Sequence, residues 1–333
     1  MKGKNKANKF SDWFLRKPES GIILILVLFV IFATCVNPTF LSGKNVINIF
    51  RASGFTLISV VGTTLVLITS GLDLSIGSVY ALGAVVCGIC MTSLNMPIPA
   101  AILMGLTVGL ICGILNGTLI VYANMPPMIA TLGMQYIARG VVSVLTKGVP
   151  IYPIPDSFVS IESAKLFGVI PMVIPVSVAL AVVGHFVLAK TVFGRSVYAI
   201  GGNQEAARIS GINTRKVKMT IYMIMGVLAA LAGILMSSRL GSAEPSTGTG
   251  LEMIVICGAV IGGISVSGGM GTMLGAVLGA VFMEALTNSL TVMKISVYWQ
   301  NVVFGIVMVL SVLLDQYKRS LIKKRSIKNA ERD

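Results

Sequence analysis

Seven long stretches of the 333-residue chain contain no charged side chain, and they constrain its fold more than any other feature. A helix that crosses the roughly 30 Å of hydrocarbon in a bilayer needs about 20 mostly apolar residues. Most stretches fit one such helix, the longest has room for about three, and one other has room for up to two. The uncharged stretches are 20–43, 52–72, 74–138, 166–189, 219–238, 253–283 and 295–314.

Composition places most of the protein surface in lipid. Charged residues make up 11% of the chain and hydrophobic residues 55%, whereas soluble domains carry roughly 25% charged residues. This excludes a soluble enzyme, a disulfide-stapled secreted module and a disordered tail. A chain in lipid must satisfy its backbone hydrogen bonds internally, which favours helices. We predict an all-α fold, a polytopic membrane bundle of about ten transmembrane helices.

Proline, glycine and asparagine breaks divide the stretches into individual spans. We expect a transmembrane domain over 20–318, flanked by basic tails at 1–19 and 319–333, with a long inner loop at 190–216. The longest external loop is predicted at 147–167. The predicted spans are about 20–36, 52–70, 74–94, 98–122, 128–146, 168–189, 217–238, 250–264, 271–290 and 296–314.

The basic residues predict the orientation. Nineteen of the 26 lysines and arginines fall in residues 1–17, 190–218 and 318–332. The positive-inside rule places these three segments in the cytoplasm. Ten spans, six before the inner loop and four after it, satisfy this arrangement. The net charge of +14 is then a topology signal that also attracts anionic lipid, and we expect no nucleic-acid partner.

Glycines inside the spans indicate close helix packing. Small residues let helices approach closely in lipid, where the hydrophobic effect does not drive association. Gly-Leu-Asp at 71–73 and Gly-Leu-Glu at 250–252 each precede such glycine-rich spans. The two copies would face opposite sides of the membrane, which predicts an inverted internal repeat. The glycine ridges are formed by Gly105, Gly109, Gly113 and Gly117, and by Gly271, Gly275 and Gly279.

Several polar residues interrupt the apolar spans. A charged side chain in mid-membrane usually faces protein or water because its insertion into hydrocarbon costs about 2.5–3.5 kcal/mol. Asp73 has three interpretations: a helix cap, part of a translocation path, or a site for a coupling cation. Glu252 could cap its span, and Glu284 could face a pore. The candidates for a path or cap are Asp73, Ser75, Glu252, Glu284 and Asn288. We expect no metal site, since the chain has one histidine, and the C-x-x-C of Cys87 and Cys90 lies inside an apolar span without a second pair.

The inner loop predicts a docking element. Ala206, Ala207 and Ile209 with neighbouring charges suit a short amphipathic helix, opened by Asn203 as its cap and closed by Gly211. Such a helix, lying along the membrane, could dock into a groove on a soluble partner. The candidate docking residues are Gly201, Gly202, Asn203, Glu205, Ala206, Ala207, Arg208 and Gly211.

Four segments in this order resemble the ribose-type sugar ABC transporter permeases, and the likeness runs from about residue 20 to 318. One contains Gly-Leu-Asp-Leu-Ser-Ile-Gly-Ser-Val, and another contains Glu-Ala-Ala followed by Gly211, the pattern of a coupling helix that enters a cleft of an ATPase. The four segments are 71–79, 201–213, 239–250 and 262–271.

The resemblance implies the permease subunit of a binding-protein-dependent importer in the bacterial cytoplasmic (inner) membrane. Two copies, identical or similar, would surround a sugar path, with ATPase subunits inside and an extracytoplasmic sugar-binding protein outside. Glu205 and Arg208 would make polar contacts with the ATPase, while Ala206, Ala207 and Ile209 pack in its cleft. The loop lacks the proline-terminated tail of the fullest Glu-Ala-Ala pattern, which leaves the docking contacts open.

The chain itself lacks a nucleotide site. A P-loop needs G-x-x-x-x-G-K-[ST], and the Gly-Lys pairs at 3–4 and 43–44 lack its other positions. We therefore expect no enzyme activity, no catalytic residue and no cofactor, with ATP hydrolysis on a partner. The alternatives are an ion-coupled secondary transporter using Asp73, Glu252 and Glu284, a membrane scaffold, and an ABC permease for branched-chain amino acids.

Overall fold

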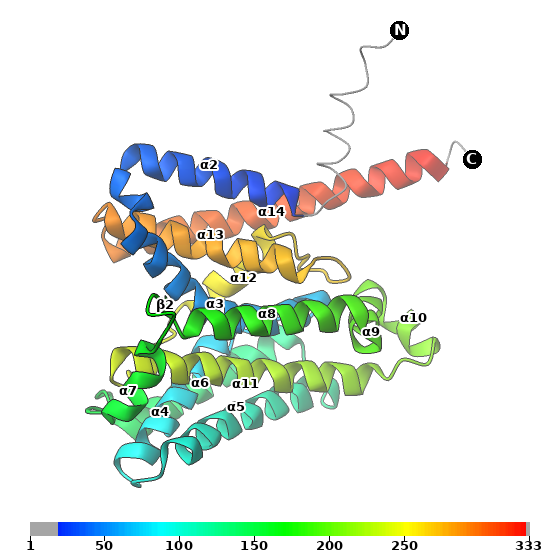
Figure 1. The fold of residues 1–333 in the computed structure, drawn as a ribbon. Coiled ribbons are helices and arrows are strands. Elements are labelled where there is room, and N and C mark those ends of the chain that lie inside the picture. Colours follow the sequence, from blue (N-terminus) through cyan, green and yellow to red (C-terminus); the bar gives the residue numbers. More distant parts are fainter. Residues whose placement is uncertain (1–18, 331–333) are drawn as a thin grey trace.

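The computed structural model describes residues 19–330 of the chain, and the predicted basic tail at 1–19 lies almost entirely outside them. The described part is a helical bundle (Figure 1), which confirms the all-α class. Its strands are two short ones, β1 (Lys165–Leu166) and β2 (Ile170–Pro171), which form an antiparallel hairpin.

Each predicted span overlaps an apolar helix. Among the described residues, six helices are long and apolar enough to cross a membrane (α3, α5, α6, α8, α11 and α13). Four further apolar segments are shorter, namely α2, α4, α12 and the part of α14 from Val297 to Ser311. A count of ten crossings therefore stays a prediction. The helices are α2 (Ser20–Val36), α3 (Gly43–Ile68), α4 (Ile76–Thr92), α5 (Ile98–Val121), α6 (Pro127–Thr146), α8 (Val173–Lys190), α11 (Thr214–Leu240), α12 (Leu251–Ile261), α13 (Met273–Val292) and α14 (Val297–Ala330).

The connections contain further short helices, and they gather at the two ends of the bundle. In Figure 1, α9 and α10 lie at one end, whereas α7 and the hairpin lie at the opposite end. The start of α2 and the end of α14 point toward the α10 end. The backbone of α14 stays helical through the predicted tail as far as Ala330. The short helices are η1 (Pro38–Leu41), α7 (Asp156–Ser163), α9 (Val192–Gly202) and α10 (Gln204–Ile209).

Helix α3 is the centre of the bundle. Every residue from Ser53 to Ile68 is buried, as expected for a helix that is covered on all sides. In Figure 1 it lies between a layer of α2, α13 and α14 and a layer that includes α8 and α11. The rest of the core forms around it, with α11 packed against α3, α4 and α5.

The predicted glycine ridges lie at helix contacts. A Cβ atom on Gly109 of α5 would lie 2.4 Å from the carbonyl oxygen of Gly226 in α11, and one on Gly226 would lie 2.1 Å from that of Gly109. The second ridge packs in the same way, because a Cβ atom on Gly279 of α13 would lie 1.8 Å from the Gly258 oxygen of α12. Such distances leave room for hydrogen only, so the two backbones touch.

Helices α4 and α12 are shorter than the hydrocarbon layer is thick. At 1.5 Å per residue they are about 25 and 17 Å long, against roughly 30 Å of hydrocarbon. Their N-terminal ends meet, since a Cβ atom on Gly77 in α4 would lie 1.9 Å from the carbonyl oxygen of Gly248, just before α12. The irregular segments 69–75 and 241–250 precede them.

Gly226→Ala should destabilise the protein, because the added methyl group overlaps the α5 backbone rather than a movable side chain. We expect a loss of about 1–3 kcal/mol and a lower unfolding temperature of the detergent-solubilised protein. Gly140→Ala in α6 is the matched control, since nothing lies within 4 Å of its Cβ position. Equal unfolding temperatures for the two variants would contradict the packing described here.

Candidate functional site

The inner loop folds into two short helices with side-chain caps. Thr191 accepts a hydrogen bond from the Gly194 N–H (3.1 Å) and starts α9, and Asn203 accepts one from the Ala206 N–H (2.9 Å) and starts α10. Gly211 ends this turn with a φ of +85°, a conformation that favours glycine. The predicted helix, its cap and its glycine stop are confirmed.

The exposed face of α10 carries an ion pair and one large apolar side chain. Arg208 Nη2 donates to Glu205 Oε1 over 2.6 Å on the exposed surface, and this hydrogen bond holds the pKa of Glu205 below its ordinary value. Ile209 beside them is 76% exposed. Ala207 is only 4% exposed and packs inside this chain, so its contact with a partner's cleft stays a prediction. Ala206 is exposed.

The α9–α10 corner touches two other parts of the bundle. A Cβ atom on Gly201 would lie 1.7 Å from the carbonyl oxygen of Ile68 at the end of α3. That same oxygen accepts the N–H of Gly269 (2.8 Å), in the turn between α12 and α13. The Ser70 hydroxyl donates to the Ser267 carbonyl (2.7 Å). We call this meeting of residues 68–71, 198–202 and 264–271 the inner junction.

A second bond fixes the inner junction from the side of α9. The Tyr198 hydroxyl donates to the carbonyl oxygen of Gly271 over 2.8 Å, just before α13. Gly202, by contrast, has nothing within 4 Å of its Cβ position. The two adjacent glycines therefore differ. The backbone of Gly201 is in contact with the backbone of Ile68, whereas a Cβ atom at Gly202 would meet no other atom.

Asp73 and Ser75 form a buried polar cluster before α4. Asp73 Oδ1 accepts the Ser75 N–H (2.8 Å) and the Ser75 hydroxyl (2.6 Å), and Asn116 Nδ2 of α5 donates to Ser75 Oγ (3.0 Å). The carboxylate therefore closes a turn directly before the helix, and both bonds come from Ser75, the residue that precedes α4. The Asn116 Oδ1 atom has no hydrogen-bond partner among the described residues.

Glu252 lies on the other side of the α4 start. It is in the first turn of α12, where a negative charge favours the helix dipole, and its Oε1 accepts from Gln135 Nε2 of α6 (3.2 Å). Arg139, one turn further along α6, donates to the carbonyl oxygens of Pro245 (2.7 Å), Thr247 (3.0 Å) and Gly77 (3.1 Å). Arg139 thus satisfies carbonyl groups in the irregular segment before α12 and ties this segment to the first turn of α4.

Glu284 and Asn288 belong to a separate group, where α13 faces α3. The Thr56 hydroxyl of α3 donates to Glu284, and Asn288 exchanges two amide hydrogen bonds with Asn45 (2.8 and 3.1 Å). The five predicted path or cap residues therefore lie in two places rather than one. Asp73, Ser75 and Glu252 surround the start of α4, and the other two lie along α13.

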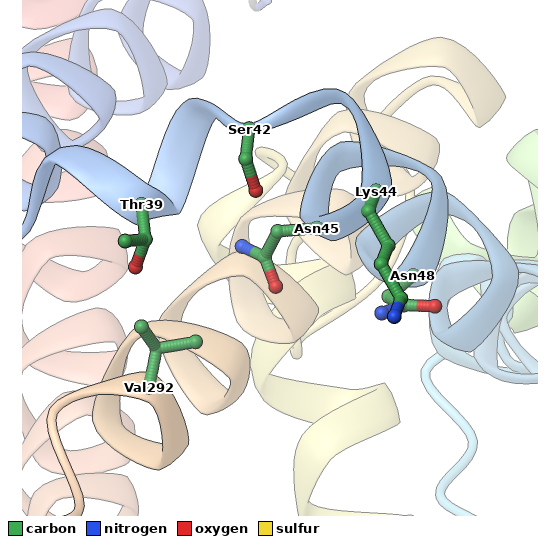
Figure 2. A pocket seen from close by; sticks show the side chains of 6 residues that line it. All are labelled: Thr39, Ser42, Lys44, Asn45, Asn48 and Val292. Atoms are coloured by element: carbon green, nitrogen blue, oxygen red, sulfur yellow. The ribbon is translucent and has the colours of Figure 1, made fainter.

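A polar pocket of about 210 Å³ adjoins the Asn45–Asn288 pair. Figure 2 shows the Asn45 amide pointing toward α13, with the Lys44 and Asn48 side chains next to each other on its far side. The pocket lies where α3 starts and α13 ends, at the bundle end opposite α10. Its lining residues are Thr39, Ser42, Lys44, Asn45, Asn48 and Val292.

Two polar residues of these clusters, Arg51 and Asn116, were not predicted from the sequence. Arg51 of α3 forms an ion pair with Glu162 of α7, whose side chain is fully buried, and Asn116 joins the Asp73 cluster. Arg51 separates two uncharged stretches, which is a signal of a functional or structural charge but does not identify its partner. Among the described residues, no group of three His, Cys, Asp or Glu could hold a metal ion.

Apolar spans, buried polar clusters and a short exposed helix at one end are the features of a membrane transport permease. The family of permease components of branched-chain amino acid transport systems matches residues 45–312, and the chain belongs to this family.

Named relatives extend over nearly the whole chain. It is 36% identical to the ribose import permease protein RbsC of Haemophilus influenzae over 94% of this chain and 98% of that protein. It is 38% identical to RbsC of Bacillus subtilis, covering 90% and 92%. The xylose transport system permease protein XylH of Escherichia coli is 31% identical, covering 92% of each. No solved structure matches the chain significantly.

Gly201→Ala should open the inner junction, because its methyl group would overlap the Ile68 carbonyl. We expect hydrogen exchange of segment 264–271 to rise about tenfold, which corresponds to about 1.4 kcal/mol of lost local stability. Gly202→Ala should leave exchange unchanged. Mass spectrometry of the deuterated, detergent-solubilised protein measures both, and equal protection in the two variants would contradict this account of the junction.

Proposed function

We propose that the chain is the membrane-spanning permease subunit of an ABC importer that moves a monosaccharide of the ribose or xylose class into the bacterial cytoplasm. The observation that carries this proposal is end-to-end similarity to permeases whose names specify ribose and xylose. The family's description mentions branched-chain amino acids instead. The pentose assignment is favoured because relatives matched over at least 90% of the chain are pentose permeases.

The topology we propose has ten crossings, with both termini in the cytoplasm. The basic clusters support this orientation, as does the position of the described chain ends toward α10. The two short helices fit an inverted repeat, because each begins after an irregular segment and their N-terminal ends meet. The Gly-Leu-Asp sequence precedes α4, and the Gly-Leu-Glu sequence runs into the first turn of α12. Discontinuous helices of this kind are typical of transporters.

ATP hydrolysis is assigned to a separate subunit that binds α10. Glu205, Arg208 and Ile209 give this helix an exposed polar and apolar surface at one tip of the bundle. Gly201 links the helix to the end of α3, and Gly269 links α3 to the α12–α13 turn. Movement of α10 would therefore displace α3 and the turn between α12 and α13 together. In this way a movement of the ATPase would reach the helices around the path and drive alternating access.

The sugar path is assigned to the polar groups inside the bundle. Asp73, Ser75 and Glu252 surround the meeting point of α4 and α12, and Glu284 and Asn288 continue toward the opposite end along α13. Carboxylates and amides of this kind can exchange their present hydrogen bonds for sugar hydroxyls. The neighbouring polar pocket (Figure 2) gives the path an opening at the α7 end.

The outer partner is a sugar-binding protein that docks on segments 147–167 and 239–250. These segments are paired, because Ile151 and Ala243 exchange two backbone hydrogen bonds of 3.1 Å. The Ser238 hydroxyl also donates to the Phe158 carbonyl (2.7 Å), so α7 is fixed to the end of α11. A second permease copy, identical or similar, would complete the importer. The secondary-transporter and scaffold alternatives are not favoured by the permease relatives.

Uptake measurements test the proposed function directly. Cells that carry the chain with its ATPase and binding protein should accumulate labelled ribose or xylose, but not leucine. Accumulation should survive collapse of the proton and sodium gradients and should stop when ATP is depleted. Leucine uptake would contradict the sugar assignment, and gradient-driven uptake by the chain alone would contradict the ABC assignment.

Ile209→Asp should weaken binding of the ATPase subunit. An isoleucine that becomes buried contributes about 1.5–3 kcal/mol, so we expect affinity to fall roughly tenfold to a hundredfold and uptake to fall with it. Ile209→Met keeps an apolar side chain and serves as the control. Co-purification with the ATPase and uptake in membrane vesicles are the measurements, and unchanged association of the Ile209→Asp protein would refute docking through this face.

A further inference from the structure

A second pocket, of about 520 Å³, lies where α5 ends and α11 begins. It is close to the inner loop, since α11 starts only a few residues after α10. The docking helix itself contributes none of its residues to this pocket. The lining residues are Tyr122, Asn213, Arg215, Lys216, Met219, Thr220 and Met223.

The chemistry of this pocket is divided between its two ends. Arg215 and Lys216 are exposed at the start of α11, and neither forms an ion pair with a described residue. Met219 and Met223 continue the lining along α11 into the apolar part of the helix. Tyr122 stands at the end of α5 and is 58% exposed. A cationic rim thus leads onto an apolar wall with an aromatic ring beside it.

The neighbouring surface is apolar. Leu103, Ile111 and Leu115 are exposed along α5, as expected for the outer side of a membrane helix. Tyrosine is enriched where helices leave the hydrocarbon, so Tyr122 marks the membrane–water boundary. The pocket therefore opens at the headgroup level, on the side where the basic inner loop lies.

We propose that this pocket binds one anionic phospholipid of the cytoplasmic leaflet. Its phosphate lies against Arg215 and Lys216, and an acyl chain lies against Met219 and Met223. Basic pockets between membrane helices on the cytoplasmic side suit such headgroups. The methionine wall favours a lipid over a free phosphate ester, because a soluble phosphate has no apolar part to place there. The assignment to the cytoplasmic leaflet rests on the orientation in the proposed function.

The lipid would sit beside the coupling element. The Lys218 ammonium group, two residues after Lys216, donates a hydrogen bond to the Gln204 side chain at the start of α10. A lipid that holds Arg215 and Lys216 therefore braces the corner between α10 and α11 from the membrane side. Anionic lipid is thus expected to support the position of the docking helix without contacting it.

The test measures lipid binding to the purified full-length protein. Native mass spectrometry detects the bound lipid while phosphatidylglycerol is titrated. The double variant Arg215→Gln/Lys216→Gln should bind about thirtyfold more weakly, the effect of two basic groups near an anionic lipid. The control Lys190→Gln/Arg195→Gln removes the same charge from exposed inner positions and should bind within twofold of the wild type. Unfolding temperatures of both variants verify that each is folded.

Two outcomes would overturn the proposal. An equal loss in the control would mean that lipid responds to overall charge rather than to this pocket. Displacement of phosphatidylglycerol by millimolar glycerol 3-phosphate would make the ligand a soluble phosphate ester. The readout needs no transport, so a wrong solute in the proposed function would leave a positive lipid result intact.

Discussion

Direct contact between glycine backbones is the interaction on which the rest of this bundle depends. Helices in lipid gain little from the hydrophobic effect and associate through close packing and hydrogen bonds. Gly226 meets Gly109, Gly233 meets the Tyr80 carbonyl, and Gly279 meets Gly258. These contacts surround α3 with neighbours close enough to bury sixteen consecutive residues, from Ser53 to Ile68. A central helix held so tightly can transmit displacement rather than absorb it.

The interrupted helices α4 and α12 depend on the same close approach. Gly77 and Gly248 bring their ends together, and Arg139 occupies three carbonyl oxygens nearby. Irregular backbone at membrane depth is tolerated where protein covers it, and here one guanidinium group donates to two carbonyl oxygens of the irregular segment before α12. This arrangement places the Asp73 carboxylate in a break in the backbone and the Glu252 carboxylate in the helical turn that follows another break. Polar groups at such a break can change partners without unfolding a helix.

Sequence alone predicted the features whose signal is local. Gaps between charges located the apolar helices, and Asn203 with Gly211 defined α10 correctly. Contacts between segments that are distant in sequence could not be predicted, because a polar residue of one type can pair with many residues elsewhere in the chain. Arg51 carried a signal without identifying Glu162, and Asn116 carried none. The inward position of Ala207 was missed because a six-residue helix has too little periodicity to separate its faces, and the helical continuation of α14 lies in a charged segment that resembles a tail.

The Ile68 carbonyl oxygen is shared by three segments that are distant in sequence. It accepts the Gly269 amide while the Gly201 backbone presses against it. Residues around 70, 200 and 268 consequently form one structural part, and evolution would have to change them in concert. Inner loops could be exchanged between relatives to make a permease work with the ATPase of another importer. Such a chimaera would need all three segments from the same relative.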